Sequence, residues 1–192
     1  MGTSSLHAYF KCGGLKSTHY YCNDDNTLPN KDRLCVSCVK ESVKAGLPPL
    51  TQCDNADMYA QLDDGIYFPQ IELLEDIVQE YPNATFFLTF RNMEKWYNSL
   101  LNWPPKKTQS GGPSMLRKVA ITDGPTTTTQ EEFSEWYCKH VQRVRDIVAK
   151  HSSHTLVEVD IDDPTVGQYM EDTFGIRKSC WGRMNANTLL NQ

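Results

Sequence analysis

Residues 84–101 read ATFFLTFRNMEKWYNSLL, and this stretch sets the fold class that the sequence predicts. Its first part, 84–90, is a continuous apolar run of the kind that is buried in a parallel β-sheet. Asn92 can cap a helix over EKWYNSLL, which ends before Pro104 and Pro105. A buried strand followed at once by a helix is typical of α/β proteins.

The alternation of helix and strand continues on both sides of that stretch. Upstream, IELLEDIVQEY over 71–81 places its apolar residues on one helical face, and a Pro-Asn pair ends this helix. Downstream, the spacing over 133–148 predicts a long amphipathic helix, which leads into a second strand at 154–161. A short helix then ends near the Phe-Gly pair at 174–175.

Length and composition predict one domain over residues 1–192. A chain of 192 residues can bury roughly 70% of its unfolded surface. Charged residues make up 22% and the net charge is -5, which argues against a general nucleic-acid binder. No run of 18 apolar residues occurs, so we expect no membrane span. Residues 106–130 are predicted to be a loop insertion, with a short helix near 115–119.

The amino-terminal residues predict a loop that holds an anion. Gly2 is followed by Thr3, Ser4 and Ser5, and apolar residues at helical spacing come next. A glycine turn at the start of a helix presents backbone N–H groups and a partial positive charge to a phosphate.

Arg91 and Ser99 form a second candidate site. Arg91 ends the predicted strand at the edge of the sheet where ligands of α/β proteins bind. Its guanidinium suits a phosphate, and Ser99, two helical turns later, can point its hydroxyl toward the same pocket. The alternative is that Arg91 pairs with a surface carboxylate and that Ser99 faces solvent.

These features resemble sulfotransferases. GTSSLHAYFKCGGL is similar to the 5′-phosphosulfate loop of that family, whose pattern is Pro-Lys-x-Gly-Thr followed by Ser or Thr. The spacing of Arg91 and Ser99 at the end of a strand is similar to the family's 3′-phosphate-binding motif. AQLD at 60–63, FPQI at 68–71 and the tail FGIRKSCWGRMNAN resemble a divergent sulfotransferase-like group.

The resemblance implies a three-layer, P-loop NTPase-like parallel sheet flanked by helices. It also implies 3′-phosphoadenosine 5′-phosphosulfate (PAPS) as the donor, with no metal. On this basis Gly2, Thr3, Ser4 and Ser5 would hold the 5′-phosphate, and Arg91 with Ser99 would hold the 3′-phosphate. The expected reaction is transfer of a sulfuryl group to a hydroxyl or amine on an unidentified acceptor.

The sequence departs from the family pattern at its start. The family's Pro and Lys, and the central first strand before them, would precede Met1 and are not in this sequence. Three explanations remain open: a start assigned at an internal methionine, a degenerate relative, or a genuine short form. As written, we expect the chain to transfer sulfate poorly or not at all. The alternative function is an inactive nucleotide-binding relative or a cysteine-stabilised interaction protein.

Two residues are candidates for the general base. His19 follows the first helix at the end of a predicted strand, where its imidazole can enter the cleft. Asp63, in AQLDDG, is the second candidate. The alternatives are a partly exposed histidine at a strand end and a simple turn at Asp63. His7 and His140 fall inside predicted helices and are interpreted as packing or surface residues.

Seven cysteines leave the redox state and the compartment open. Cys35 and Cys38 have the C-x2-C spacing of zinc ligands, and Cys22 with Cys53 could complete such a site. The predicted order is buried core thiols first, disulfides second and zinc third. The compartment is taken as cytoplasmic by default, with the Golgi lumen if an amino-terminal segment is missing. The sequon at 83–85 adjoins a strand predicted to be buried, where a glycan would fit badly.

Overall fold

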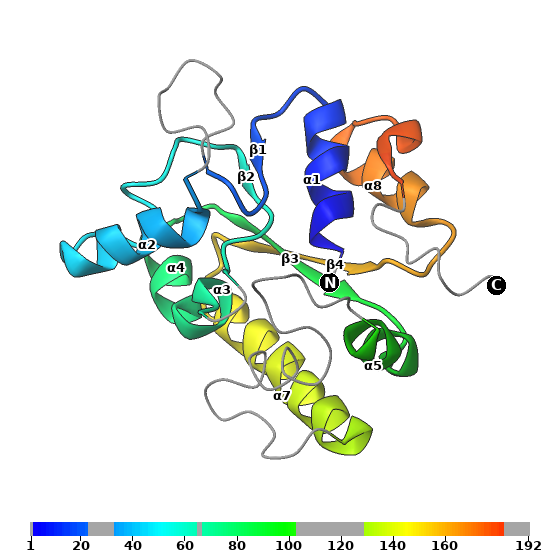
Figure 1. Ribbon diagram of the computed structural model, residues 1–192. Helices are drawn as coiled ribbons and strands as arrows, with labels where there is room; N and C mark the ends of the chain where they lie inside the picture. Colours follow the sequence, from blue (N-terminus) through cyan, green and yellow to red (C-terminus); the bar gives the residue numbers. More distant parts are fainter. Residues whose placement is uncertain (1, 23–32, 65–66, 103–128, 183–192) are drawn as a thin grey trace. The chain divides into compact units, whose positions relative to one another are not determined.

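The computed structural model describes residues 2–22, 33–64, 67–102 and 129–182 (Figure 1). The chain divides into two compact units. Unit 1 is formed by 1–64 together with 160–192, and unit 2 is formed by 65–159. That the whole chain forms one domain stays a prediction.

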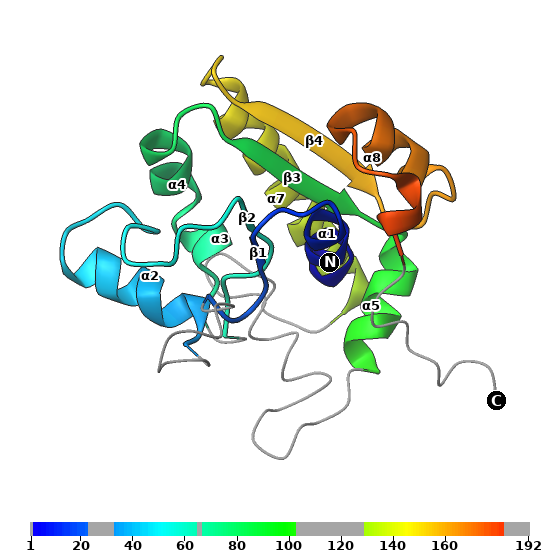
Figure 2. The same ribbon diagram turned by 90° about the horizontal axis from the view of Figure 1, so that it is seen from above.

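Unit 2 is built on two strands that the sequence predicted. β3 spans Thr85–Phe90 and β4 spans Thr155–Asp160, whose last residue already belongs to unit 1. The strands are neighbours in a two-stranded sheet and run in the same direction (Figure 2). At their amino ends the Thr155 amide donates to the Ala84 carbonyl at 3.1 Å. The predicted α/β alternation is therefore confirmed here.

Helices supply the rest of the unit 2 core. The helices are α3 (Pro69–Glu72), α4 (Leu74–Glu80), α5 (Met93–Leu101) and α7 (Gln130–Ala149). Apolar side chains of α4 and α7 pack with those of β3, because each helix keeps one apolar stripe. The buried members of this cluster are Leu74, Val78, Leu88, Val141, Val144, Ile147 and Val148.

The helix predicted over 71–81 is interrupted. Leu73 leaves the helical conformation at φ -110° and ψ 24°, so α3 and α4 are separate elements. The Arg143 guanidinium donates to the Ile71 carbonyl at 3.0 Å and occupies an acceptor that a continuous helix would use. Hydrophobic spacing did not reveal this break because the apolar residues keep the same face on both sides of it.

Unit 1 contains the amino-terminal helix and a second pair of strands. Its elements are α1 (Thr3–Cys12), β1 (Ser17–Thr18), α2 (Cys35–Lys44), β2 (Met58–Tyr59), α8 (Val166–Phe174) and the 3₁₀ turn η1 (Lys178–Cys180). β1 and β2 are parallel, with Ser17 opposite Met58. Both described sheets have two strands, so the fold is α/β, and the three-layer arrangement stays a prediction.

An aromatic cluster joins α1 to the carboxyl-terminal elements of unit 1. The buried ring of Tyr9 lies edge-on to Trp181 with centroids 5.8 Å apart, and its hydroxyl donates to the Ile176 carbonyl at 2.8 Å. Phe10 contacts Phe174 in the same manner at 5.3 Å. Gly175 ends α8 with φ 70°, as the Phe-Gly pair predicted. The predicted insertion at 106–130 lies almost entirely outside the described residues.

Candidate functional site

The amino end of α1 is the first part of the candidate site. Gly2 precedes the helix with φ 70°, a left-handed conformation that glycine adopts without steric cost. Thr3, Ser4 and Ser5 then form the first turn, which contains no acidic residue. The first backbone N–H groups of a helix have no intrahelical partner, and they add a partial positive charge at this end. The local geometry therefore suits an anion.

His19 lies at this helix end. It follows β1, and its Nε2 is 3.3 Å from the Thr3 Oγ1 and 3.2 Å from the Ser4 Oγ. These contacts join residues that are 16 and 15 positions apart in the sequence. The structure thus brings together two sets of residues that the sequence analysis had proposed separately, a phosphate loop and a general base.

His7 extends the cluster by one turn of α1. Its Nδ1 is 3.0 Å from the Ser17 Oγ, and its ring lies 5.6 Å from that of His19. The interpretation of His7 as a packing or surface residue was therefore incomplete. The four-residue spacing from Thr3 to His7, which places both on one helical face, was the available signal. The sequence held no such signal for Ser17, because its contact with His7 depends on how β1 packs beside α1.

The pKa of His19 is lowered from its ordinary value of 6.5. Burial is the largest cause, and the nearby charge of His7 adds to it. Asp63, which follows β2, acts in the opposite direction and raises the pKa of His19. Both predicted base candidates therefore lie within electrostatic reach of each other, and the imidazole is neutral near pH 7.

Tyr20 fixes the direction of the chain beyond His19. Its φ is 67°, which is an uncommon conformation for an aromatic residue. Hydrogen bonds hold it on both sides: its amide donates to the Gln61 carbonyl at 3.1 Å, and its carbonyl accepts from the Cys35 amide at 2.9 Å. Strained backbone of this kind often occurs beside functional residues, because the surrounding structure must enforce it.

Arg91 and Ser99 belong to unit 2. Arg91 is half-buried and directly follows β3, and Asn92 then caps α5 by accepting from the Lys95 amide at 3.0 Å. Ser99 lies on α5 and is also half-buried. The predicted positions at a strand end and on the next helix are therefore confirmed. That these two residues and the α1 end hold one ligand stays a prediction.

The cysteines correct the order that the sequence analysis gave. Disulfides join Cys12 to Cys180, Cys22 to Cys35 and Cys38 to Cys53. The first choice, buried core thiols, is wrong for these residues, and the second choice describes them. In the part of the chain that the structure describes, Cys138 is an exposed free thiol.

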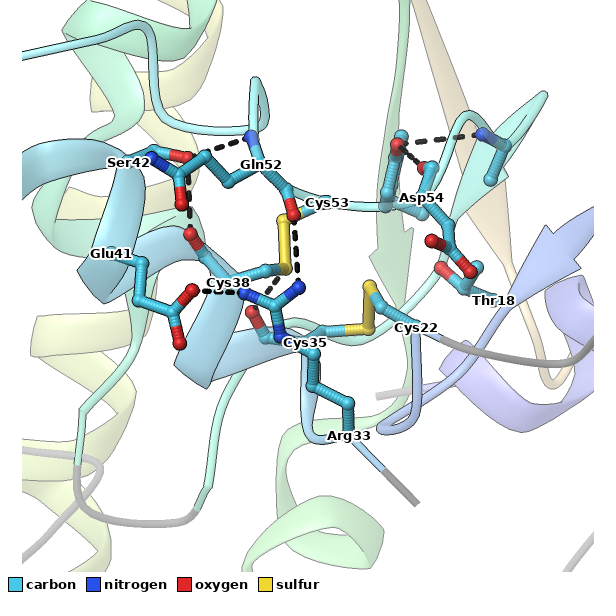
Figure 3. Close-up of a disulfide and its surroundings, with 12 residues drawn as sticks. Thr18, Cys22, Arg33, Cys35, Cys38, Glu41, Ser42, Gln52, Cys53 and Asp54 are labelled. Atoms are coloured by element: carbon cyan, nitrogen blue, oxygen red, sulfur yellow. Dashed lines mark hydrogen bonds and ion pairs between the residues drawn. A yellow bond between two sulfur atoms is a disulfide. The ribbon is translucent and has the colours of Figure 1, made fainter. Parts of the chain in front are cut away.

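Two of the disulfides fasten α2 to its neighbouring segments (Figure 3). The C-x2-C cysteines at the start of α2 pair outward, Cys35 with the segment after His19 and Cys38 with the segment before β2. The sulfur atoms of Cys22, Cys38 and Cys53 all lie within 4.8 Å of one another. Zinc binds thiolates, and the disulfides occupy the sulfurs that such a site would need.

Arg33 adds a polar bridge beside these disulfides. Its guanidinium donates to the Gln52 carbonyl at 3.2 Å and forms an ion pair with Glu41 (Figure 3).

Of the described helices, none combines the length and the apolar character that a membrane crossing requires.

Comparison with known proteins identifies the family. A family model described as a sulfotransferase domain matches residues 1–165, which is more than half of the chain. No curated protein and no solved structure matches the chain significantly. The matched region contains the α1 end with His19, and it contains Arg91. The chain therefore belongs to the sulfotransferase family.

Proposed function

We propose that this protein binds 3′-phosphoadenosine 5′-phosphosulfate and that its reaction, which the sequence as written is expected to perform poorly, transfers the sulfuryl group to a hydroxyl or amine of an acceptor. The observation that carries the proposal is the contact of His19 with Thr3 and Ser4 at the amino end of α1. It joins an anion-binding helix end to a group that can accept a proton.

The amino end of α1 fits the 5′-phosphosulfate group. Two hydroxyls and the first-turn N–H groups are donors for phosphate oxygens, and the first turn holds no carboxylate that would repel them. When the donor binds, the Thr3 and Ser4 hydroxyls can turn from His19 to the phosphate. His19 is then released to face the acceptor.

His19 fits the role of general base. Because burial lowers the pKa of His19, its ring is neutral near pH 7 and Nε2 can accept the acceptor's proton. As the acceptor oxygen or nitrogen bonds to sulfur, the bond from sulfur to the 5′-phosphate breaks. The leaving group is 3′-phosphoadenosine 5′-phosphate. The carboxylate of Asp63 favours the imidazolium that results, since it raises the pKa of His19.

Arg91 and Ser99 are proposed to hold the 3′-phosphate. A guanidinium at the carboxyl end of a parallel strand is well placed for a nucleotide phosphate, and it binds two oxygens at once. This contact would distinguish the donor from ATP, which has no 3′-phosphate.

Calorimetric titration with 3′-phosphoadenosine 5′-phosphate tests the binding half of the proposal. Arg91→Ala and the double change Thr3→Ala with Ser4→Ala should each weaken binding by about tenfold or more, because each removes charge-assisted donors. Lys139→Ala is the matched control, since this exposed lysine forms an ion pair with Glu135 of its own helix, α7. Equal affinity of all four proteins would overturn the nucleotide assignment.

Release of the 3′,5′-bisphosphate product from the full donor tests the catalytic half. Phenol, carbohydrate and amine acceptors are supplied in turn, and His19→Gln should reduce release with little change in donor affinity. Binding without release from any acceptor would favour the inactive nucleotide-binding relative. No binding at all would favour an interaction protein held by its disulfides.

A further inference from the structure

The turn between α4 and β3 carries the sequon Asn83-Ala84-Thr85, the one Asn-x-Ser or Asn-x-Thr triplet in the sequence. Such triplets are acceptors for N-linked glycans when they reach the surface of a protein in the secretory route. The adjoining strand suggested that a glycan would fit badly here. The structure contradicts that expectation, because Asn83 and Thr85 are both exposed.

Asn83 is exposed and lies in a turn with φ 62°. Asparagine tolerates this left-handed conformation better than most residues, so Asn83 fits the turn without backbone strain. Pro82 before it is exposed as well. Thr85, at the first position of β3, is exposed too, whereas the next two residues of the strand are partly buried. The carboxamide and the hydroxyl of the sequon are therefore both at the surface.

The cysteine pairing gives a second, independent observation. Disulfides between Cys12 and Cys180, Cys22 and Cys35, and Cys38 and Cys53 form and persist in oxidising compartments and are rare in the cytoplasm. The secretory lumen is the compartment in which both disulfides and N-linked glycans are added. The pairing and the exposed sequon indicate the same environment.

We propose that Asn83 is an N-glycosylation site of a chain that folds in an oxidising secretory compartment. The side-chain amide nitrogen of Asn83 would lose one proton and bond to the anomeric carbon of an oligosaccharide. The co-substrate is a lipid-linked oligosaccharide pyrophosphate, whose lipid pyrophosphate is the leaving group. No electrons are exchanged in this step.

The glycan would be compatible with the proposed nucleotide site. Asn83 precedes β3 and Arg91 follows it, so the strand separates the two residues by roughly 20 Å at about 3.3 Å per residue. The Ala84 carbonyl also accepts from the first residue of β4. The sugar would therefore leave from the amino ends of both strands, at the opposite edge from Arg91.

The full chain, preceded by a secretory signal sequence and expressed in cultured animal cells, provides the test. We expect one glycan, seen as a gain in mass that peptide N-glycosidase F removes, and mass spectrometry should assign it to Asn83. Asn83→Gln and Thr85→Ala should each abolish the gain. Thr85→Ser keeps a sequon and should retain it.

Asp57→Thr supplies the matched positive control. This change creates a second sequon at Asn55, which is exposed in unit 1 and far along the sequence from Asn83. A wild-type chain that emerges without a glycan overturns the proposal. One glycan at Asn55 of the Asp57→Thr chain would show in that case that the oligosaccharide-transferring enzyme had reached this protein. Since no nucleotide enters this experiment, its failure is distinct from failure of the proposed function.

Discussion

The pKa of the His19 imidazole depends on neighbours that come from two separate segments. Burial and His7 on α1 lower its pKa, whereas Asp63 after β2 raises it. The sequence offered His19 and Asp63 as alternative bases. The structure makes them members of one cluster, in which the carboxylate supports the imidazolium form.

This balance predicts how His19 titrates in a variant. Asp63→Asn removes a charge that raises the pKa of His19, so the pKa should fall further below 6.5. Nitrogen-detected NMR of the histidine rings measures it directly. Asp57→Asn changes a carboxylate that accepts from the Lys16 amide at 2.8 Å, and it should leave His19 unchanged. An unchanged pKa in Asp63→Asn would remove Asp63 from the proposed mechanism.

Gly13 is required for a steric reason. A Cβ at this position would lie 2.4 Å from the Ile176 Cδ1. The backbone conformation is not the reason, because the φ of Gly13, -75°, is open to any residue. Gly13→Ala should therefore lower the free energy of unfolding by about 1–3 kcal/mol through overpacking. Urea unfolding measures the loss. Gly182→Ala, where no atom of the described residues lies within 4 Å, should change little, and Ile176→Ala should restore part of the loss in the double variant.

At the scale of elements, prediction from sequence was best where the signal is local. The cap at Asn92 and the glycine that ends α8 depend on a few neighbouring residues, and both are found in the structure. The break at Leu73 is accompanied by a hydrogen bond to Ile71 from Arg143, which is 72 positions away. Long-range contacts of this kind leave no periodic signal.

Helix α7 carries a titrating group that should make stability depend on pH. His140 stacks on Trp136 with ring centroids 5.6 Å apart, and burial, with the nearby charge of Arg143, lowers the pKa of His140 to about 4. The unfolded chain then binds more protons between about pH 6.5 and about pH 4. The contribution of His140 to the free energy of unfolding is therefore complete above about pH 6.5, and it is lost as the pH falls toward about 4.

His140→Phe isolates this contribution, because phenylalanine keeps the stack and does not titrate. Wild-type protein should lose up to about 3 kcal/mol more than the variant when the pH falls from about 7 to about 4. Urea unfolding of both proteins at the two pH values gives the difference. Parallel loss in the two proteins would show that His140 is not the group responsible.

At the scale of the whole molecule, the family could be predicted but the cross-links could not. The order of the glycine loop and the Arg-Ser pair indicated a sulfotransferase, and the family match over 1–165 confirms it. Cysteine pairing cannot be deduced from spacing, since four cysteines already allow three connectivities. The C-x2-C pair favoured core thiols in a helix, whereas the fold brings each cysteine to a partner outside that helix.

The disulfide from Cys12 to Cys180 should be the strongest single constraint on unit 1. It joins residues 168 positions apart, the end of α1 and the turn η1, and chain entropy assigns about 5 kcal/mol to a loop of this length. Cys12 is exposed and Cys180 is half-buried, so replacing both with serine leaves only a small cavity. Most of the loss in the free energy of unfolding should therefore come from the higher conformational entropy of the unfolded chain without the cross-link.

Guanidinium unfolding of the Cys12→Ser, Cys180→Ser double variant measures this loss against wild-type protein. Cys138→Ser is the control, because that thiol is free and exposed and its removal should leave the midpoint unchanged. Adding a dithiol reductant should lower the wild-type midpoint at least as far as the double variant, because it also opens the two pairs at α2. A double variant as stable as wild-type protein would mean that the aromatic cluster of Tyr9, Phe10 and Trp181 holds these segments together without the cross-link.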